Sequence, residues 1–179
     1  MTTETSTPSL VSLDYIPYLD ENGQIPIHAA GKVGVYAIFD QDQILQHIGY
    51  SRDVYLSLKQ HLVRKPQLCY WWKFQTINRP SRTVLEAMRD AWIAENGSTP
   101  IGNGPDADAW NQPIDAKLTM TEADKTAYEQ TDELGQMKLL KKIARRVESE
   151  VKAALASRGV QMDLRFNPKL KENGLLDLK

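Results

Sequence analysis

Basic side chains are concentrated between residues 50 and 89, where eight Arg and Lys residues stand against two acidic ones. The whole chain of 179 residues has a formal net charge of only −1, which excludes a polyanion-binding protein that is basic throughout. A local basic face can still bind phosphate groups. The alternative is ordinary solvated surface with screened charges. The residues expected to contact nucleic acid are Lys59, His61, Arg64, Lys65, Arg79 and Arg82.

The cysteine content and the motifs of the chain exclude several other kinds of functional site. Cys69 is the single cysteine, which excludes an intrachain disulfide and a zinc site built from several cysteines. We expect Cys69 to be a small buried apolar residue. The Gly102-Asn-Gly104 turn lacks the Lys-Ser/Thr pair of a phosphate-binding loop. No Ser/His/Asp arrangement can be traced in the sequence.

The basic stretch is interleaved with strand and helix patterns. Two apolar runs, Val33–Phe39 and Ile44–Tyr50, are joined by a polar turn and predict an antiparallel hairpin. Ser51 or Asp53 then caps a helix that reaches about Lys65. The run Cys69–Ile77 predicts a third strand.

A second helix is predicted from about Arg82 to Glu95, with Ser81 as its N-cap and Gly97 beyond its end. The order is therefore β-β-α-β-α. This order predicts an α+β fold with a small, mostly antiparallel sheet, followed by a long C-terminal helix.

The predicted domains are a flexible N-terminal arm over residues 1–32, the α+β domain over 33–103, a loop over 104–120 and a helical extension over 121–179. Residues 1–12 are rich in Ser and Thr and are expected to be disordered. The extension carries one narrow apolar seam within residues 137–155. We expect this seam to dock onto the α+β domain. The alternative is a protein partner, including a second copy of the chain.

The motifs of residues 33–103 resemble those of the GIY-YIG endonuclease superfamily. Gly34-Val35-Tyr36 stands in place of the first motif and His47-Ile48-Gly49 in place of the second, with histidine where the family has tyrosine. Ser51 to His61 is similar to the first helix of that family in pattern and length, and Pro100 to Asn103 resembles its Pro-x-x-Asn ending. Each motif is short, so the resemblance depends on their order.

This resemblance implies Mg²⁺-dependent cleavage of a phosphodiester in DNA or RNA. It makes Tyr36 the base, with His47 and Arg52 as further catalytic residues and Glu86 or Asp90 as the metal ligand. Ser57 stands where the family has its helix arginine, and serine cannot replace a guanidinium. The resemblance therefore leaves two functions open. One is a degenerate nuclease, and the other is a catalytically inactive module of the same fold that acts as an interaction or regulatory protein.

The sequence also bears on localisation. No apolar run approaches the roughly 18 residues of a membrane helix, and Met1 to Leu13 has neither a basic residue nor an apolar core. These features are unlike a secretory signal or a transit peptide. We therefore expect a cytoplasmic protein.

Overall fold

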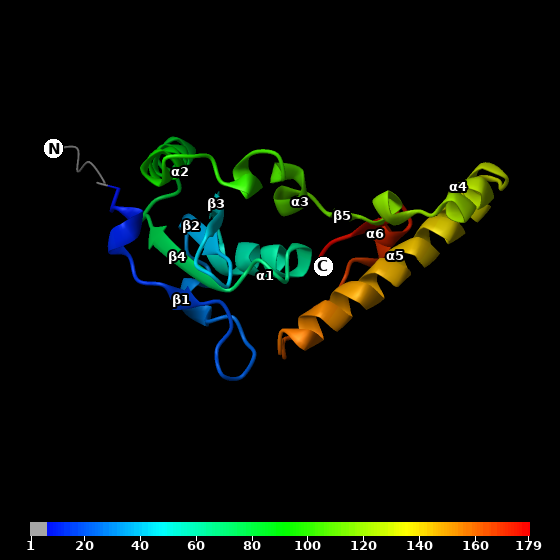
Figure 1. Cartoon of the computed structure of the whole chain (residues 1–179), viewed down its shortest axis with the longest axis horizontal. Coiled ribbons are helices and arrows are strands. Elements are labelled where there is room, and N and C mark those ends of the chain that lie inside the picture. The colour runs from blue at the N-terminus through cyan, green and yellow to red at the C-terminus, as the bar shows by residue number, and fades with distance from the viewer. Residues whose placement is uncertain (1–6) are drawn as a thin grey trace. The chain divides into compact units, whose positions relative to one another are not determined.

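The computed structural model describes residues 7–179. The chain divides into two compact units, the first ending at Asn111 and the second covering Gln112–Lys179. Each unit is described here by itself (Figure 1).

The first unit is built on a four-stranded sheet. Its strands are β1 (Ile16–Pro17), β2 (Gly34–Phe39), β3 (Leu45–Ser51) and β4 (Trp71–Thr76), in the spatial order β1-β4-β2-β3 with every neighbouring pair antiparallel. Strand β2 lies between β3 and β4 and is buried along its whole length. The predicted α+β class and the antiparallel hairpin are confirmed.

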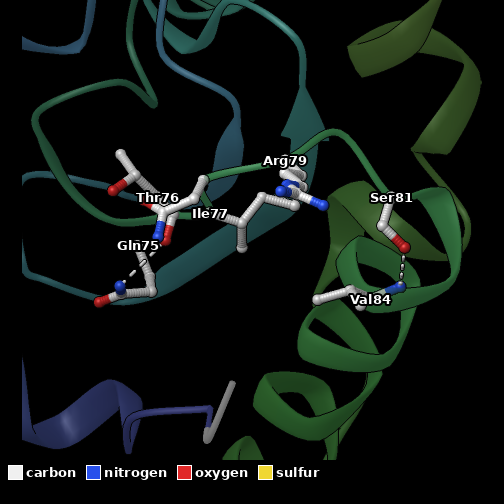
Figure 2. A pocket seen from close by; sticks show the side chains of 7 residues that line it. Gln75, Thr76, Ile77, Arg79, Ser81 and Val84 are labelled. Carbon is white, nitrogen blue, oxygen red and sulfur yellow. Dashed lines mark hydrogen bonds between the residues drawn. The ribbon is translucent and has the colours of Figure 1, made fainter. Parts of the chain in front are cut away.

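Two helices flank this sheet, and both begin at the predicted caps. Helix α1 (Val54–Arg64) is capped by Asp53, whose side chain accepts a hydrogen bond from the Leu56 amide. Helix α2 (Arg82–Asn96) is capped by Ser81, which accepts from the Val84 amide (Figure 2). Gly97 follows α2 with φ +79°, the left-handed conformation that glycine adopts without strain.

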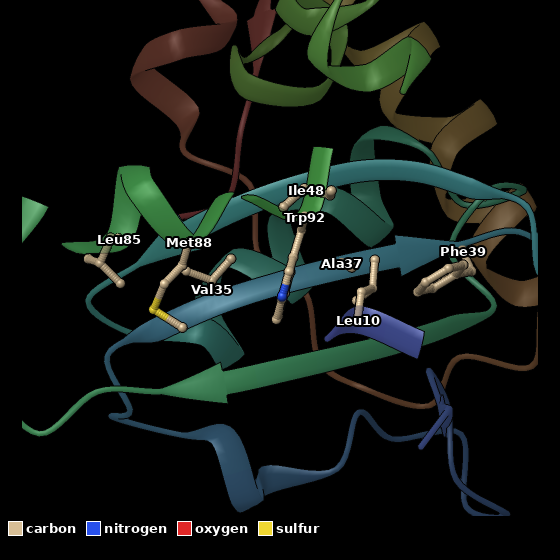
Figure 3. Packing of buried hydrophobic residues seen from close by; sticks show 8 residues of the cluster. All are labelled: Leu10, Val35, Ala37, Phe39, Ile48, Leu85, Met88 and Trp92. Atoms are coloured by element: carbon tan, nitrogen blue, oxygen red, sulfur yellow. The ribbon is translucent and has the colours of Figure 1, made fainter. Parts of the chain in front are cut away.

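The main apolar core fills the α2 side of the sheet. Leu85, Met88 and Trp92 of α2 pack with strand residues such as Val35 and Ala37 (Figure 3). Because side chains alternate along a strand, Tyr36 points to the other side, where α1 lies. The sheet therefore separates Tyr36, on the α1 side, from the predicted metal ligands Glu86 and Asp90 of α2.

The N-terminal segment is held on the α2 side of the sheet. Its 3-10 turn, Leu10–Ser12, buries Leu10 in the core. Both carboxylate oxygens of Glu95 accept bonds from this segment, including the Leu10 amide at 3.0 Å, and the Lys73 ammonium donates to the Leu10 carbonyl at 3.0 Å. The expectation that residues 1–12 are disordered is wrong for this segment, because long-range partners order it. The part of that expectation on residues 1–6 lies outside the described residues.

The chain after α2 closes the outer edge of β3. The side chain of Asn103, in the 3-10 turn Ile101–Asn103, accepts from the Ile48 amide and donates to the Ile48 carbonyl, each at 2.7 Å. Helix α3 (Ala107–Asn111) follows and buries Trp110. The prediction that residues 104–120 form a loop is therefore wrong where short elements occur. Helix α3 is ordered because the Trp110 side chain packs in the interior of the first unit.

The second unit is organised around the long helix α5 (Glu133–Ser157). Around α5 lie the short pair β5 (Ile114–Asp115) and β6 (Leu175–Leu176), the 3-10 turn Ala116–Thr119, α4 (Glu122–Glu129) and α6 (Pro168–Lys171). The apolar seam of α5 is largely buried and contacts this turn, α6 and β6. The predicted long C-terminal helix is confirmed. Among residues 7–179, no helix is both long and apolar enough to cross a membrane.

Candidate functional site

Two predicted catalytic residues, Tyr36 and His47, meet on the α1 side of the sheet. The Tyr36 hydroxyl and His61 Nε2 are 2.7 Å apart, and the His47 ring lies 4.8 Å from the His61 ring, centroid to centroid. Trp110 stacks on His47 at 5.2 Å with the two ring planes 9° apart. All four side chains are buried. We refer to Tyr36, His47, His61 and Trp110 as the buried aromatic cluster.

Gly49 makes room for this cluster. Gly49 pairs with Tyr36 across the β2–β3 ladder, so the space beside its Cα lies on the same face as the tyrosine ring. A methyl group at residue 49 would lie 2.5 Å from the Tyr36 hydroxyl and 3.0 Å from His47 Nε2. The second motif therefore needs glycine here for a packing reason.

Burial makes the cluster electrically neutral. Burial raises the pKa of Tyr36 far above its ordinary value and lowers the pKa of His47 to about 4, although the His47 bond to the Gly102 carbonyl acts in the opposite direction. The pKa of His61 is also lowered well below its ordinary value, first by burial and then by His47 and Arg64. Neutral, buried rings are poorly suited to holding a phosphate group.

The predicted metal ligands lie elsewhere. Glu86 accepts hydrogen bonds from the Tyr50 hydroxyl at 3.0 Å and from Arg82 Nε at 2.7 Å, and Asp90 pairs with Arg89 at 3.1 Å. Tyr50 follows Gly49 and so points to the α2 side of the sheet. No group of three or more His, Cys, Asp or Glu among the described residues is arranged to hold a metal ion. The structure does not bring Glu86 or Asp90 to Tyr36.

The predicted nucleic-acid-binding residues also separate. Arg64, the last residue of α1, donates to the Trp110 carbonyl at 2.9 Å, and Lys65, directly after α1, forms an ion pair with Asp106 at 2.6 Å, so both contact the α3 region. Lys59, also on α1, lies over the Tyr55 ring. His61 belongs to the buried aromatic cluster. Arg79 and Arg82 instead lie beside the start of α2.

An open cavity of about 340 Å³ lies where β3 ends and α2 begins. Arg52, one of the predicted catalytic residues, and Arg82 supply its positive charge. The remaining lining residues are Tyr50, Ser51, Pro80, Ser81 and Leu85. Glu86 accepts a hydrogen bond from Nε of Arg82, and the pKa of Glu86 is held below its ordinary value, first by that arginine. A guanidinium has five N–H donors, so donors remain for a ligand.

A larger cavity of about 700 Å³ shares Ser81 with this one. It is lined by residues from the end of β4 and the start of α2: Gln75, Thr76, Ile77, Asn78, Arg79, Ser81 and Val84 (Figure 2). Gly34 pairs with both Ser51 of β3 and Thr76 of β4, so the two cavities lie at the same end of the sheet. We call them together the arginine end of the sheet.

The sequence reasoning did not find all of these residues. It did not single out Tyr50 as a site residue, and it treated Ser81 only as a helix cap. The contact between Tyr50 and Glu86 joins residues 36 positions apart, and no local pattern reports it. Trp110 was not predicted as a site residue either. A large aromatic side chain inside a predicted loop is the one feature of the sequence that points to it.

Comparisons with known proteins do not return the expected family. No family model matches the chain. The chain is similar to a curated Arabidopsis thaliana protein, a chloroplastic bifunctional monothiol glutaredoxin, with 34% identity over 93 residues. The match covers 48% of this chain and 32% of the relative, so the chain spans about a third of that protein. This coverage does not transfer the activities of the whole relative to the chain.

These findings correct the predicted family. The relative is named a glutaredoxin, which contradicts a GIY-YIG endonuclease and equally a catalytically inactive module of that family. The expected nuclease activity and its Mg²⁺ cofactor are corrected with it, since the described residues hold no metal-binding group either. Binding of DNA or RNA is left without support. The relative is chloroplastic by name, which does not confirm the expected cytoplasmic location.

Proposed function

We propose that the first unit binds a small anionic ligand at the arginine end of the sheet. The observation that carries this proposal is the open cavity of about 340 Å³ with both Arg52 and Arg82 in its wall. Arginine donates paired N–H groups that match the oxygens of a phosphate or a carboxylate. Ser51 and Ser81 add hydroxyl groups to the same wall.

The size of the site favours a small molecule. A cavity of about 340 Å³ is at the lower end of the range of about 300–1,000 Å³ that ligand pockets occupy. Three other basic residues predicted for the surface, Lys59, Arg64 and Lys65, lie on α1 or directly after it and are not part of this wall. The two arginines that would bind a small anion, Arg52 and Arg82, thus line the same cavity.

Removing one arginine from the wall tests the proposal. Titration of the full chain with inorganic phosphate at low salt is expected to show saturable binding that weakens as salt is added. Arg52→Ala and Arg82→Ala are each expected to weaken binding about tenfold, the value of one charge-assisted hydrogen bond. Arg165→Ala is the matched control, because Arg165 is an exposed arginine of the second unit that pairs with Asp163.

Two results would contradict the proposal. One is the absence of saturable binding for phosphate, succinate and glutathione alike. The other is equal loss of binding in Arg165→Ala and Arg52→Ala. Glutathione is included because the relative is named a monothiol enzyme and this thiol peptide carries carboxylates. Thiol chemistry by this chain itself would use Cys69, and Cys69 is fully buried, which is typical of an unreactive thiol.

A second candidate function is protein binding through the helix that contains residues 137–155. Most of its seam is buried inside the second unit, but Met137 and the neighbouring Leu134 are 39% and 57% exposed. They border a cavity of about 530 Å³. We propose a second copy of the chain as the partner.

The native mass of the chain tests this proposal. Native mass measured at about 100 μM should exceed the monomer mass and fall in the double variant Leu134→Lys, Met137→Lys. A monomer mass for the unchanged chain would contradict self-association.

We propose a reducing compartment, such as the cytoplasm, as the location. The single cysteine, Cys69, is buried, and the chain has no second cysteine with which it could form an intrachain disulfide. This composition is common in proteins that fold where thiols stay reduced.

A further inference from the structure

We infer that the anion bound at the arginine end of the sheet is the phosphate group of a small ester whose body carries several hydroxyl groups. This inference rests on the proposed function, because it assigns the ligand class of the same site. It uses a separate observation, the second cavity and the chemistry of its wall.

The two cavities form a site longer than an inorganic anion. They share Ser81 and lie at one end of the sheet, where Gly34 separates the ends of β3 and β4. The larger cavity, about 700 Å³, exceeds the volume that a phosphate group alone requires. A ligand whose head contacts Arg52 and Arg82 therefore has space for a body directed toward the end of β4.

The wall of the larger cavity indicates what that body is made of. Gln75 and Asn78 offer side-chain amides, which both donate and accept hydrogen bonds, and Nε2 of Gln75 also donates to the Thr76 carbonyl at 3.1 Å. Ile77 and Val84 supply a limited apolar surface (Figure 2). An alkyl body would leave these polar groups without partners as it displaced water, whereas hydroxyl groups would pair with them.

The head group is assigned as phosphate because two arginines line the smaller cavity, where the head is placed. Arg52 and Arg82 line the smaller cavity, and Arg79 lines the larger one. Glu86, the carboxylate nearest to Arg82, holds Nε of that arginine and the Tyr50 hydroxyl. Glu86 thus acts as a positioning residue that orients the guanidinium. A phosphate group offers more acceptor oxygens to two arginines than a carboxylate does.

Four probes of the full chain test this assignment by calorimetric titration. They are inorganic phosphate, glucose 6-phosphate, hexyl phosphate and glucose. Glucose 6-phosphate is expected to bind about tenfold more tightly than inorganic phosphate, since each good hydrogen bond of the body contributes about that factor at most. Hexyl phosphate should bind no more tightly than inorganic phosphate, and glucose should not bind measurably.

Variants assign the effect to the two parts of the site. Gln75→Ala and Asn78→Ala should reduce the affinity for glucose 6-phosphate to that of inorganic phosphate, while leaving the affinity for inorganic phosphate unchanged. Arg52→Ala should weaken both ligands by the same factor. Circular dichroism of each variant checks that the unit is folded, and Asn96→Ala, at the far end of α2, serves as the control.

The possible failures are distinguishable. Equal affinity for inorganic phosphate and glucose 6-phosphate, or tighter binding of hexyl phosphate, would overturn the inferred body and leave anion binding intact. Tighter binding of succinate than of phosphate would overturn the inferred head group alone. Loss of binding for every anion would overturn the proposed function together with this inference.

Discussion

Lowering the pH from 7 to 5 is expected to destabilise the first unit through His47 and His61. Both histidines are buried and have pKa values below the ordinary 6.5, about 4 for His47. The unfolded chain therefore takes up protons as the pH falls through 6.5, whereas the folded unit does not. The stability that these neutral rings provide is present above pH 6.5 and is lost as the pH falls toward 4. The expected loss at pH 5 is about 2 kcal/mol for His47, and His61 contributes a further loss of the same sign.

Urea unfolding followed by tryptophan fluorescence measures this effect. All four tryptophans, Trp71, Trp72, Trp92 and Trp110, lie in the first unit, so their emission reports on that unit. Carboxylates whose pKa is lowered, such as Glu86 and Glu95, lose their contribution only near pH 4 and below, so the series stops at pH 5. His47→Gln should reduce the dependence between pH 7 and 5 by about 2 kcal/mol. An unchanged dependence in that variant would show that His47 is not the group that titrates.

Replacing Trp92 with alanine is expected to destabilise the first unit by about 3–5 kcal/mol. Trp92 is 1% exposed and lies in the core between α2 and the sheet. Its indole N–H also donates to the Pro8 carbonyl at 2.9 Å, which ties the N-terminal segment to α2. The substitution removes packing on both sides of this contact and leaves a cavity. Thermal unfolding by circular dichroism gives the measurement.

Two matched variants separate the contributions of Trp92. Trp92→Phe retains most of the packing and removes the N–H donor, so a smaller loss of about 1–2 kcal/mol is expected. Leu56→Ala, on the half-exposed side of α1, should change stability by about 0.5 kcal/mol or less. If Trp92→Ala and Leu56→Ala unfold at the same temperature, Trp92 does not carry the core.

The motif comparison illustrates how far short patterns can be trusted for function. The Gly-Val-Tyr and His-Ile-Gly triplets, in order and on the expected strands, resembled a nuclease family, and the comparisons with known proteins contradicted that family. Three-residue motifs also satisfy local demands of packing. Gly49, for example, is required by the closeness of Tyr36 and His47, whatever the cluster does.

The sequence by itself determined the local structure of the first unit. The two apolar runs predict β2 and β3, and the caps at Asp53, Ser81 and Gly97 mark the ends of α1 and α2. These features depend on neighbours within a few residues, because a cap bonds its own helix and a hairpin strand pairs across a short turn. The α+β class follows from their order.

Only the tertiary structure decided which side chains share a site. His47 meets Trp110, and Tyr50 meets Glu86, although each pair is far apart in sequence. Alternation along β3 places the side chains of His47 and Tyr50 on opposite faces of the sheet. Glu86 contacts Tyr50, so the sheet separates Glu86 from His47, although both were predicted for one catalytic site. Burial keeps the predicted catalytic residues Tyr36 and His47 neutral. Arg52 and Arg82 instead line an open cavity. Register and burial are properties of the whole fold, and no local pattern encodes them.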